Sequence, residues 1–537
     1  MTEQSDAEPA NSPLTKEILV YVFQWLQDDL ESLAKCCLIS KKWCHVAKPL
    51  LWRSPVFYKC KQFERFRKIV AGTPGVAKLV LELDCDGYRR EIMAYLQKLL
   101  KFLPNLEQVV FPCFASLSQH SLVPVDSGSL SKLQKIHYIE VLPSEEGIPF
   151  LTTLFGECTK LKELSLKLYG FSGISLPISF PTSHSITFIE LIGDEFEETL
   201  IKSLLQRLPN LNRFELCADD VPRNLISSLA SHCPKINQLK FEFTGTYMDV
   251  TVHNLLRQMI KKFGGRLKKV GILFSREARV SIPEDLINKL WRSLVKLESF
   301  SLSYFMITDM LNKLAKCEKK SLKELELAYV SNEAASLNTW ENFFKACGGN
   351  LTKLSISFSK LPVDIGEVIA RHCPNLREVS LYFTNISDAS VIPIVQRCHS
   401  LRKLDLNTTD ITAKSVESIS EHCTQLEFLM LDKADNNSCP SEVEPLFSYL
   451  RKYGHRIQRV GLAGWTMTDE LLRLIAETTP YLKELRITNG EYVSDAALEY
   501  LINKCARLKR LHVIGNSDGV GISKELLKKS DLIYSCN

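Results

Sequence analysis

A short apolar motif recurs along most of this chain at regular intervals. The segments CPNLREVSL, CHSLRKLDL and CTQLEFLML begin at Cys373, Cys398 and Cys423, each 25 residues after the one before. All three contain the pattern L-x-x-L-x-L, whose last positions alternate between apolar and other residues, as in a β-strand with one buried face. A chain that repeats one short strand so often must fold as a stack of similar units rather than around one central core.

The motif has seventeen candidate copies, spaced 25 to 31 residues apart. They begin at Val76, Leu106, Leu133, Leu161, Ile186, Leu211, Ile236, Leu267, Leu297, Leu322, Leu351, Leu376, Leu401, Leu426, Ile457, Leu482 and Leu508. Helical patterns such as DASVIPIVQRC and AKSVESISEHC lie between the strand patterns. One strand and one helix cannot bury a core alone, but stacked copies can, so we predict an α/β solenoid.

This period and motif resemble those of leucine-rich repeats. The resemblance implies a curved solenoid with parallel strands on the concave face and helices on the convex face. Six cysteines lie three residues before the first apolar strand position, where a small buried residue suits the corner between helix and strand. They are Cys158, Cys233, Cys373, Cys398, Cys423 and Cys505. A histidine precedes three of them, but a pair repeated at a structural corner does not indicate a catalytic site.

The composition argues against several classes of protein. The 67 basic and 62 acidic residues give a net charge of +5, which attracts nucleic-acid phosphates only weakly. No apolar run approaches the roughly 20 residues that span a bilayer, and the first residues lack the pattern of a secretory signal. We therefore expect a protein of the cytoplasm or nucleus with reduced cysteines and no membrane contact. Motifs of catalytic, metal and phosphate sites are missing, so we expect neither an enzyme nor a cofactor.

The segment before the repeats contains three short helical patterns rich in apolar residues. The first carries Ile18 and Val22 one turn apart, and the third runs from near Ser40 until Pro49 interrupts it. So small a unit cannot enclose all its apolar surface. Part of that surface should therefore bind a partner or pack against the first repeat.

This segment resembles an F-box. The matching residues are Leu14, Glu17, Ile18, Leu19, Phe23, Leu26, Asp29, Leu30, Trp43, Leu51 and Trp52. The sequence departs from the family pattern at Thr15, where proline is usual, and at Ile39–Ser40, where Val-Cys is usual. The style of the segment is similar to that of the expanded fungal F-box proteins.

Together the two resemblances imply a non-catalytic, substrate-recognition subunit of a Skp–cullin–F-box ubiquitin ligase. The F-box would bind the Skp adaptor, and through it a cullin, while the repeats bind an unknown protein substrate. The residues implied at the adaptor interface are Leu14, Ile18, Leu19, Phe23, Leu26, Leu30, Leu33 and Trp43. Packing of Trp43 and Trp52 against the first repeat is the alternative for the two tryptophans.

The predicted organisation has five segments. They are a disordered tail at 1–11, the F-box at 12–57, a helical connection at 58–75, about seventeen repeats at 76–515 and a C-terminal cap at 516–537, with a helix from Ile522.

The concave face should carry the substrate site, because the polar strand positions point there. Phe428 and Met430 are two large apolar residues at such positions, with Arg459 and Arg486 nearby, so they are a candidate binding centre. They could instead cover a shallow dip in the surface. The candidate substrate-binding residues are Tyr382, Lys403, Asp405, Phe428, Met430, Arg459 and Arg486.

A second class of function stays open at this stage. The chain could be a repeat scaffold or inhibitor that binds one protein, with the F-box-like helices serving only as an N-terminal cap. Whether the protein needs the Skp adaptor to remain soluble would separate the two. A small-molecule or inositol phosphate site in the arc is less supported, because the concave positions hold no tight basic cluster.

Overall fold

The computed structural model describes residues 15–24, 30–55, 57, 60–85, 99–111, 131–141, 147–170, 176–245, 249–275, 282–305, 310–330, 335–433, 443–489, 493–505, 507–508, 510–515 and 533–535. The chain forms two compact units. The first contains residues 1–139 and 149–163, and the second contains residues 140–148 and 164–537.

The first unit begins with short helices, of which the first three share one small core. They are α1 (Lys16–Gln24), α2 (Leu30–Ile39), α3 (Lys41–Arg53), α4 (Cys60–Gly72) and α5 (Pro74–Ala77). Leu19, Phe23, Leu33, Val46 and Ala47 form the centre of the core between α1, α2 and α3. The side chain of Ser40 accepts a hydrogen bond from the backbone N–H of Trp43 at 3.2 Å and so caps the start of α3. The three predicted helices are confirmed.

Three short strands follow in the first unit. These are β1 (Glu82–Asp84), β2 (Gln108–Val110) and β3 (Lys135–Glu140), which pair in parallel, and α8 (Gly147–Glu157) comes after them. The predicted repeat at Val76 is out of register, because Val76 lies in α5. The buried residues in β1 and next to it are Val80, Leu83 and Cys85. Val76 and Val80 are both apolar and four residues apart, so the sequence pattern fits either, and only the pairing of Leu83 with Val109 decides.

The second unit alternates strands and helices in the predicted order. Its strands are β4 (Glu163–Lys167), β5 (Phe188–Ile192), β6 (Arg213–Ala218), β7 (Gln238–Phe243), β8 (Lys269–Phe274), β9 (Ser299–Phe305), β10 (Glu324–Val330), β11 (Lys353–Ser357), β12 (Glu378–Ser380), β13 (Lys403–Asp405), β14 (Phe428–Met430), β15 (Arg459–Leu462), β16 (Glu484–Asn489), β17 (Arg510–Gly515) and β18 (Ile533–Ser535). From β5 onward, each described strand pairs in parallel with the next.

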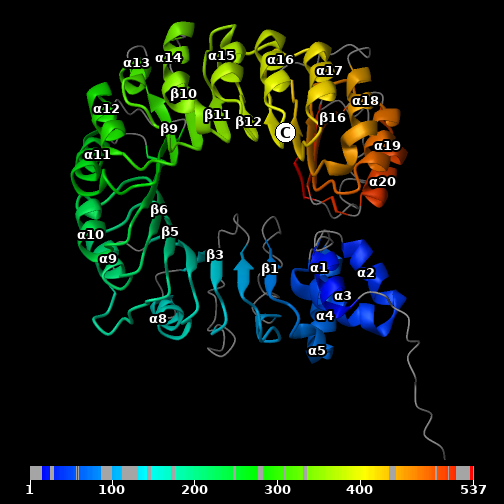
Figure 1. Cartoon of the computed structure of the whole chain (residues 1–537). Coiled ribbons are helices and arrows are strands. Elements are labelled where there is room, and N and C mark those ends of the chain that lie inside the picture. The colour runs from blue at the N-terminus through cyan, green and yellow to red at the C-terminus, as the bar shows by residue number, and fades with distance from the viewer. Residues whose placement is uncertain are drawn as a thin grey trace, which may run out of the picture. The chain divides into compact units, whose positions relative to one another are not determined.

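The helices of this unit connect one strand to the next. They are α9 (Glu198–Leu205), α10 (Leu225–His232), α11 (Asp249–Phe263), α12 (Glu284–Ser293), α13 (Met310–Ala315), α14 (Leu337–Cys347), α15 (Ile365–His372), α16 (Asp388–Arg397), α17 (Ala413–His422), α18 (Glu444–Tyr453), α19 (Asp469–Thr478) and α20 (Asp495–Lys504), with 3-10 turns η2 (Gly348–Asn350) and η4 (Gly454–Arg456). Figure 1 shows these helices on the outer side of a curve and the strands on its inner side. The predicted fold class is therefore confirmed.

The predicted cysteine corners are also confirmed. Cys233, Cys373, Cys398, Cys423 and Cys505 are the residues at which their helices end, and all five are buried. The Cys398 thiol donates to the backbone carbonyl of Cys373 in the preceding repeat at 3.5 Å. A small side chain with a weak donor fits this tight corner and adds a hydrogen bond between neighbouring repeats.

The C-terminal part differs from the prediction. Strand β18 pairs in parallel with β17, with Ile533 opposite Arg510. The sequence does not predict this strand, because DLIYSCN lacks the leucine pattern of the repeats. The helix predicted from Ile522 lies outside the described residues. The other segment boundaries remain predictions. In the part of the chain that the structure describes, no helix is both long and apolar enough to cross a bilayer.

Candidate functional site

Several residues predicted at the adaptor interface are buried inside the N-terminal helices. Leu19, Phe23 and Leu33 are at most 1% exposed. The ring of Phe23 meets the ring of Trp43 edge to face, with their centroids 5.2 Å apart. These three residues hold the three helices together in the chain by itself, and their contact with a partner stays a prediction. Trp43 is half-buried against the same core.

Other apolar residues of these helices face solvent. On α1, Ile18, Tyr21 and Val22 lie three and four residues apart, which places them on one helix face, and they are 44%, 63% and 43% exposed. At the end of α2, Leu38 is 86% exposed and Ile39 is 59% exposed. Of these five, only Ile18 was among the predicted interface residues. Leu38 and Ile39 continue an apolar helix, and their exposure depends on how the helices pack, which the sequence alone does not show.

The remaining predicted residues of this surface are not decided. Leu14 and Leu26 lie outside the described residues. Leu30 begins α2, and its side chain is outside the described set.

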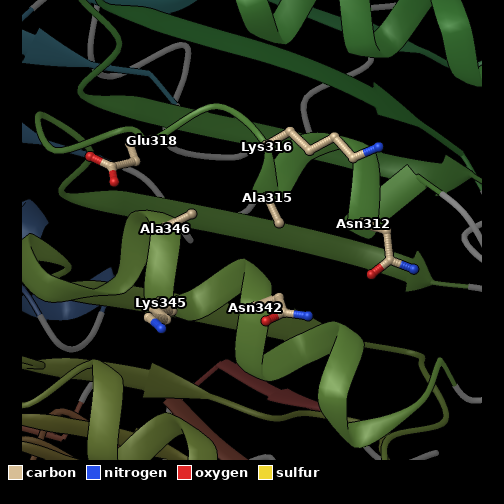
Figure 2. Close-up of a pocket in the computed structure, with 7 residues that line it drawn as sticks. All are labelled: Asn312, Ala315, Lys316, Glu318, Asn342, Lys345 and Ala346. Carbon is tan, nitrogen blue, oxygen red and sulfur yellow. The ribbon is translucent and has the colours of Figure 1, made fainter.

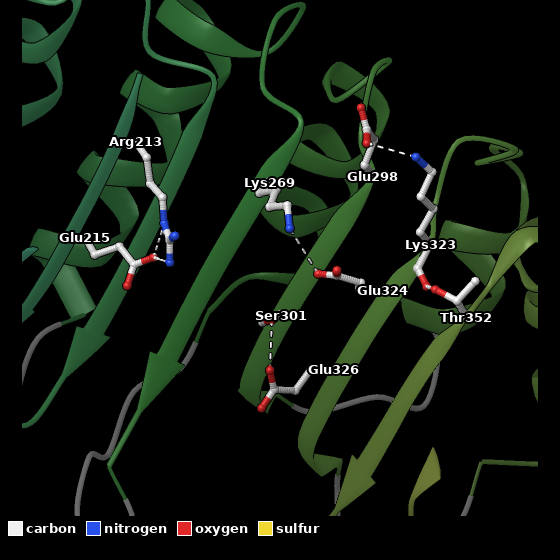
Figure 3. Close-up of polar contacts among 9 residues, drawn as sticks. All are labelled: Arg213, Glu215, Lys269, Glu298, Ser301, Lys323, Glu324, Glu326 and Thr352. Carbon is white, nitrogen blue, oxygen red and sulfur yellow. Dashed lines mark hydrogen bonds and ion pairs between the residues drawn. The ribbon is translucent and has the colours of Figure 1, made fainter. Parts of the chain in front are cut away.

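The inner face of strands β6 to β10 is lined with charges that pair with one another (Figure 3). Arg213 Nε donates to Glu215 at 2.7 Å, and Lys269 lies 3.4 Å from Glu324. Lys323 lies 3.2 Å from Glu298, which is also 3.0 Å from Lys268. The two lysines lower the pKa of Glu298. Charges that are already paired leave little net attraction for a partner on this part of the face.

The inner face of β12 to β17 holds most of the residues predicted to bind a substrate. Lys403 Nζ lies 2.8 Å from Glu378. The Arg459 guanidinium lies 5.9 Å from the centroid of the half-buried Phe428 ring and 3.8 Å from Glu484. Glu484 is also 3.5 Å from Arg510. Phe428 and Arg459 therefore lie together, as predicted, although their binding role stays a prediction.

Met430 does not fit the predicted binding centre. It is 3% exposed, and its Cε and Sδ atoms occupy the space that a Cβ at Gly461 would need. The sequence showed an apolar residue at a concave position next to a glycine. It could not show that the glycine lets the methionine fold down against the sheet, out of reach of a partner.

Arg486 is engaged with a buried carboxylate. Its Nε lies 3.2 Å from Asp432, whose side chain is 7% exposed. Burial raises the pKa of Asp432 to about 6, and Arg486 offsets part of that effect. The neighbouring Asp405 also has a raised pKa, caused by burial and partly offset by hydrogen bonds from the Asn407 backbone and Ser380. Asp405 is thus a concave carboxylate whose charged form is poorly stabilised.

An aromatic stack lies at the C-terminal ends of β10, β11 and β12. Tyr329 is the last residue but one of β10, and Phe358 and Phe383 follow β11 and β12; each comes two positions after a buried leucine or isoleucine. The rings of Tyr329 and Phe358 stack at 4.5 Å, and those of Phe358 and Phe383 at 5.0 Å. Tyr382 meets Phe358 at 5.0 Å and Phe383 at 5.1 Å, edge to face in both cases. Tyr382 was among the predicted residues; the other three were not, although their equal place in three consecutive repeats was a usable signal.

Two family models match the chain. The F-box-like model matches residues 16–58, which include the three core helices. The model described as FBD-associated F-box protein At5g56370, LRR repeats, matches residues 308–432, from α13 to the end of β14.

The chain has an F-box-like domain followed by leucine-rich repeats.

Several solved structures are similar to this chain at low sequence identity and with TM-scores below 0.5. One is the complex of Rad7 and Elc1 in yeast, with 13% identity, a TM-score of 0.42, and 94% of this chain and 95% of that chain covered. Another is the TLR13–ssRNA13 complex, with 15% identity, a TM-score of 0.36, and coverage of 83% and 68%. A third is an internalin, inlF, from Listeria monocytogenes, with 14% identity, a TM-score of 0.29, and coverage of 85% and 95%. No curated protein matches the sequence.

The helix that follows the F-box-like domain, α4, packs against the end of that domain. The match to the F-box-like model ends at residue 58, close to the predicted boundary at 57, and the following α4 continues the apolar packing. Trp52 stacks on Phe66 of α4, with ring centroids 6.3 Å apart. Trp52 thus joins the F-box-like domain to the connecting helix, which favours the packing role over a partner role for this tryptophan.

A shallow pocket lies between α13 and α14 on the convex side of the repeats (Figure 2). Its volume is about 480 Å³, and its lining residues are Asn312, Ala315, Lys316, Glu318, Asn342, Lys345 and Ala346. The charged ends of Lys316 and Glu318 point in opposite directions in Figure 2, so they do not converge on one ligand position. Within the described ranges, no group of three or more His, Cys, Asp or Glu residues could hold a metal ion.

Proposed function

We propose that this chain is a substrate-recognition subunit of a Skp–cullin–F-box-type ubiquitin ligase. The F-box-like domain would bind a Skp-type adaptor, and through it a cullin, while the inner face of the repeats binds a target protein. The observation that carries this proposal is the F-box-like domain itself, whose first two helices keep apolar residues exposed. Large exposed apolar side chains on a small domain mark a protein interface.

The chain would carry out no bond chemistry of its own. Its role would be to hold a target close to the ubiquitin-carrying enzyme, which raises the effective concentration of target lysines. A solenoid suits this role because each repeat is fixed by its neighbours, so a bound target keeps a defined direction. The ligase would act in the cytoplasm or the nucleus.

The adaptor interface can be tested with variants that leave the helical core intact. We would co-express the full chain with a Skp-type adaptor and compare co-purification of wild type with a Leu38→Asp, Ile39→Asp double variant. Both residues are exposed, so the charges should abolish binding without unfolding the helices. A variant with alanine at both Phe23 and Trp43 would be a poor test, because those rings pack together in the core.

The matched control is Val363→Asp, an exposed apolar residue of the repeats at 65% exposure. It should co-purify with the adaptor as wild type does. If wild type is soluble alone and does not bind the adaptor, the ligase proposal fails, and the helices serve as a cap on a protein-binding scaffold.

A further inference from the structure

The three stacked residues at the ends of β10, β11 and β12 have strained backbone conformations. Tyr329, Phe358 and Phe383 have positive φ angles of 55°, 49° and 56°. At the same repeat position, the turn after β15 uses Gly464, with φ 81°. The left-handed region suits glycine and is unfavourable for bulky residues. Three consecutive repeats nevertheless place an aromatic ring there, and such strain gathers at functional sites.

The stack ends with a ring that is open to solvent. In the next repeat the corresponding residue is Thr408, which also has a positive φ, 57°, but no ring. Phe383, the last member, is 42% exposed. Ring stacking stabilises the inner members, but it does not explain why the last ring stays uncovered. We refer to Tyr329, Phe358, Tyr382 and Phe383 as the aromatic shelf.

The strand surface that leads to the aromatic shelf is small and acidic. Across β10 to β13, one row of inward-facing positions holds Glu326, Ser355, Ser380 and Asp405 in register. Serine hydroxyls contact the two acids: Ser301 donates to Glu326 at 3.0 Å, and Ser380 donates to Asp405 at 3.4 Å. Among the described residues, neither acid forms an ion pair with a lysine or arginine. We refer to this row as the acidic floor. It has small serine side chains in the middle and, at each end, a carboxylate that forms no ion pair with a described lysine or arginine.

The wider surface has the same sign. The adjacent row alternates Glu324, Lys353, Glu378 and Lys403, so the two rows together hold four carboxylates and two lysines. Lys403 is already paired with Glu378, and Glu324 with Lys269, so Glu326 and Asp405 are the two carboxylates of these rows without an ion pair among the described residues. The nearest arginine to influence Asp405 is Arg486, which is held by Asp432. Positive charge to balance the remaining carboxylates of this surface would have to come from a partner.

Phe383 and Asp405 are close enough to contact one extended segment of a partner. The Leu381 N–H donates to the Asp405 carbonyl at 2.8 Å, and the Phe383 N–H donates to the Asn407 carbonyl at 2.9 Å. Because Ser380 is opposite Asp405 in the sheet, Phe383 lies on the adjacent chain segment three residues, or roughly 10 Å, further along. Two arginines of one extended segment can span this distance, since a flat guanidinium can stack on a ring or donate to a carboxylate.

We propose that the aromatic shelf and Asp405 form the recognition site for an arginine-bearing segment of a protein partner. One arginine of this segment would stack on the open face of Phe383, and a second would donate to Asp405. That this partner is a ubiquitination substrate rests on the function proposed above; the recognition site itself does not. The acidic floor disfavours phosphate groups, so the occupant is a protein segment rather than a nucleic acid or a lipid headgroup.

The test uses the full chain, purified with its adaptor if it needs one. Three fluorescently labelled peptides, identical except for two central residues that are arginine, glutamate or proline, are titrated while anisotropy is measured. We expect the arginine peptide to bind, and Phe383→Ala and Asp405→Asn each to weaken it by about tenfold. Phe102→Ala removes another exposed ring, 44% exposed against 42% for Phe383, and is the matched control, with affinity expected to be unchanged.

Three results would overturn the proposal: no binding of the arginine peptide up to about millimolar concentration, tighter binding of the glutamate or proline peptide, or equal losses in the Phe102→Ala control. Thermal unfolding of each variant shows whether it is folded, and Asp405→Asn, which keeps the side-chain shape, remains informative if Phe383→Ala unfolds. Co-purification with the adaptor is measured on the same variants. Loss of adaptor binding with peptide binding intact would refute the ligase proposal alone, and the reverse would refute the recognition site alone.

Discussion

At the scale of single residues, buried carboxylates on the inner face matter most. Asp432 accepts a hydrogen bond from the Ala463 N–H at 2.9 Å and lies 3.2 Å from Arg486. These contacts only partly offset the loss of solvation of the Asp432 carboxylate, since its pKa is still raised from 3.8 to about 6. The residue therefore links the stability of the neighbouring strands to pH.

Replacing Asp432 with asparagine should change that dependence. The folded protein binds the Asp432 proton more tightly than the unfolded chain does, so this group makes the unfolding free energy fall as pH rises from about 4 to about 6. Above about pH 6 the wild type no longer has the stabilisation that proton binding to Asp432 gives at lower pH. The asparagine of Asp432→Asn binds no proton, so the variant has no such pH-dependent contribution. The difference in unfolding free energy should shift toward the variant by about 2 to 3 kcal/mol across this window, at about 1.4 kcal/mol per pKa unit.

Urea unfolding of both proteins at a series of pH values from about 4 to about 7 would measure this difference. A difference that stays constant with pH would show that Asp432 has an ordinary pKa in the folded protein.

At the scale of helices and strands, the repeats are held together by close backbone approaches and by polar side chains that reach the preceding repeat. Asn105, Asn210, Asn350 and Asn375 each donate from Nδ2 to a backbone carbonyl of the previous repeat, at 2.7 to 2.9 Å. On the convex side, the start of α15 lies so close to α16 that a Cβ at Gly366 would overlap the carbonyl oxygen of Ser390. The spacing of adjacent helices therefore depends on one missing methyl group.

Gly366→Ala should accordingly destabilise the protein, although alanine is the better helix former. The clash is with backbone atoms, which cannot rotate away, so we expect a loss of about 1 to 3 kcal/mol or more. Gly349→Ala in the 3-10 turn η2 is the matched control, since a Cβ there meets nothing within 4 Å. Thermal or urea unfolding of the two variants measures the contrast, and similar midpoints would mean that α15 and α16 are less tightly packed than the structure indicates.

At the scale of the whole molecule, the buried corner cysteines report how cooperatively the repeats unfold. Burial raises the pKa of Cys233 and Cys423 to about 12 and that of Cys398 and Cys505 to about 11. Each repeat contacts mainly its neighbours, so a local defect should open a limited set of repeats.

Native thiol labelling at about pH 8 should therefore leave these four cysteines unmodified, while denaturant makes them reactive, because only the thiolate attacks the reagent. In Gly366→Ala, Cys373 and Cys398 should react before Cys233, since they end the helices on either side of the clash. Mass spectrometry of labelled peptides locates the reactive sites. Equal labelling rates at all corners in the variant would indicate that the solenoid unfolds as one unit.

The sequence by itself determined the repeat architecture. Regular spacing of L-x-x-L-x-L fixes which residues enter the core of each repeat, and a cysteine three residues earlier marks six of the corners, so strands and helices follow from local pattern. The F-box-like helices were likewise predictable, because a family pattern spans residues 14–52 with few departures.

Only the tertiary structure decided which residues can be touched by a partner. Phe23 and Ile18 both belong to the apolar pattern of α1, yet one is 1% and the other 44% exposed, because exposure depends on how α2 and α3 pack on α1. Met430 is hidden by its fit over Gly461, a neighbour 31 residues away. Tyr329, Phe358 and Phe383 form one stack because parallel strands bring the same position of successive repeats together, and that depends on register as well as on composition.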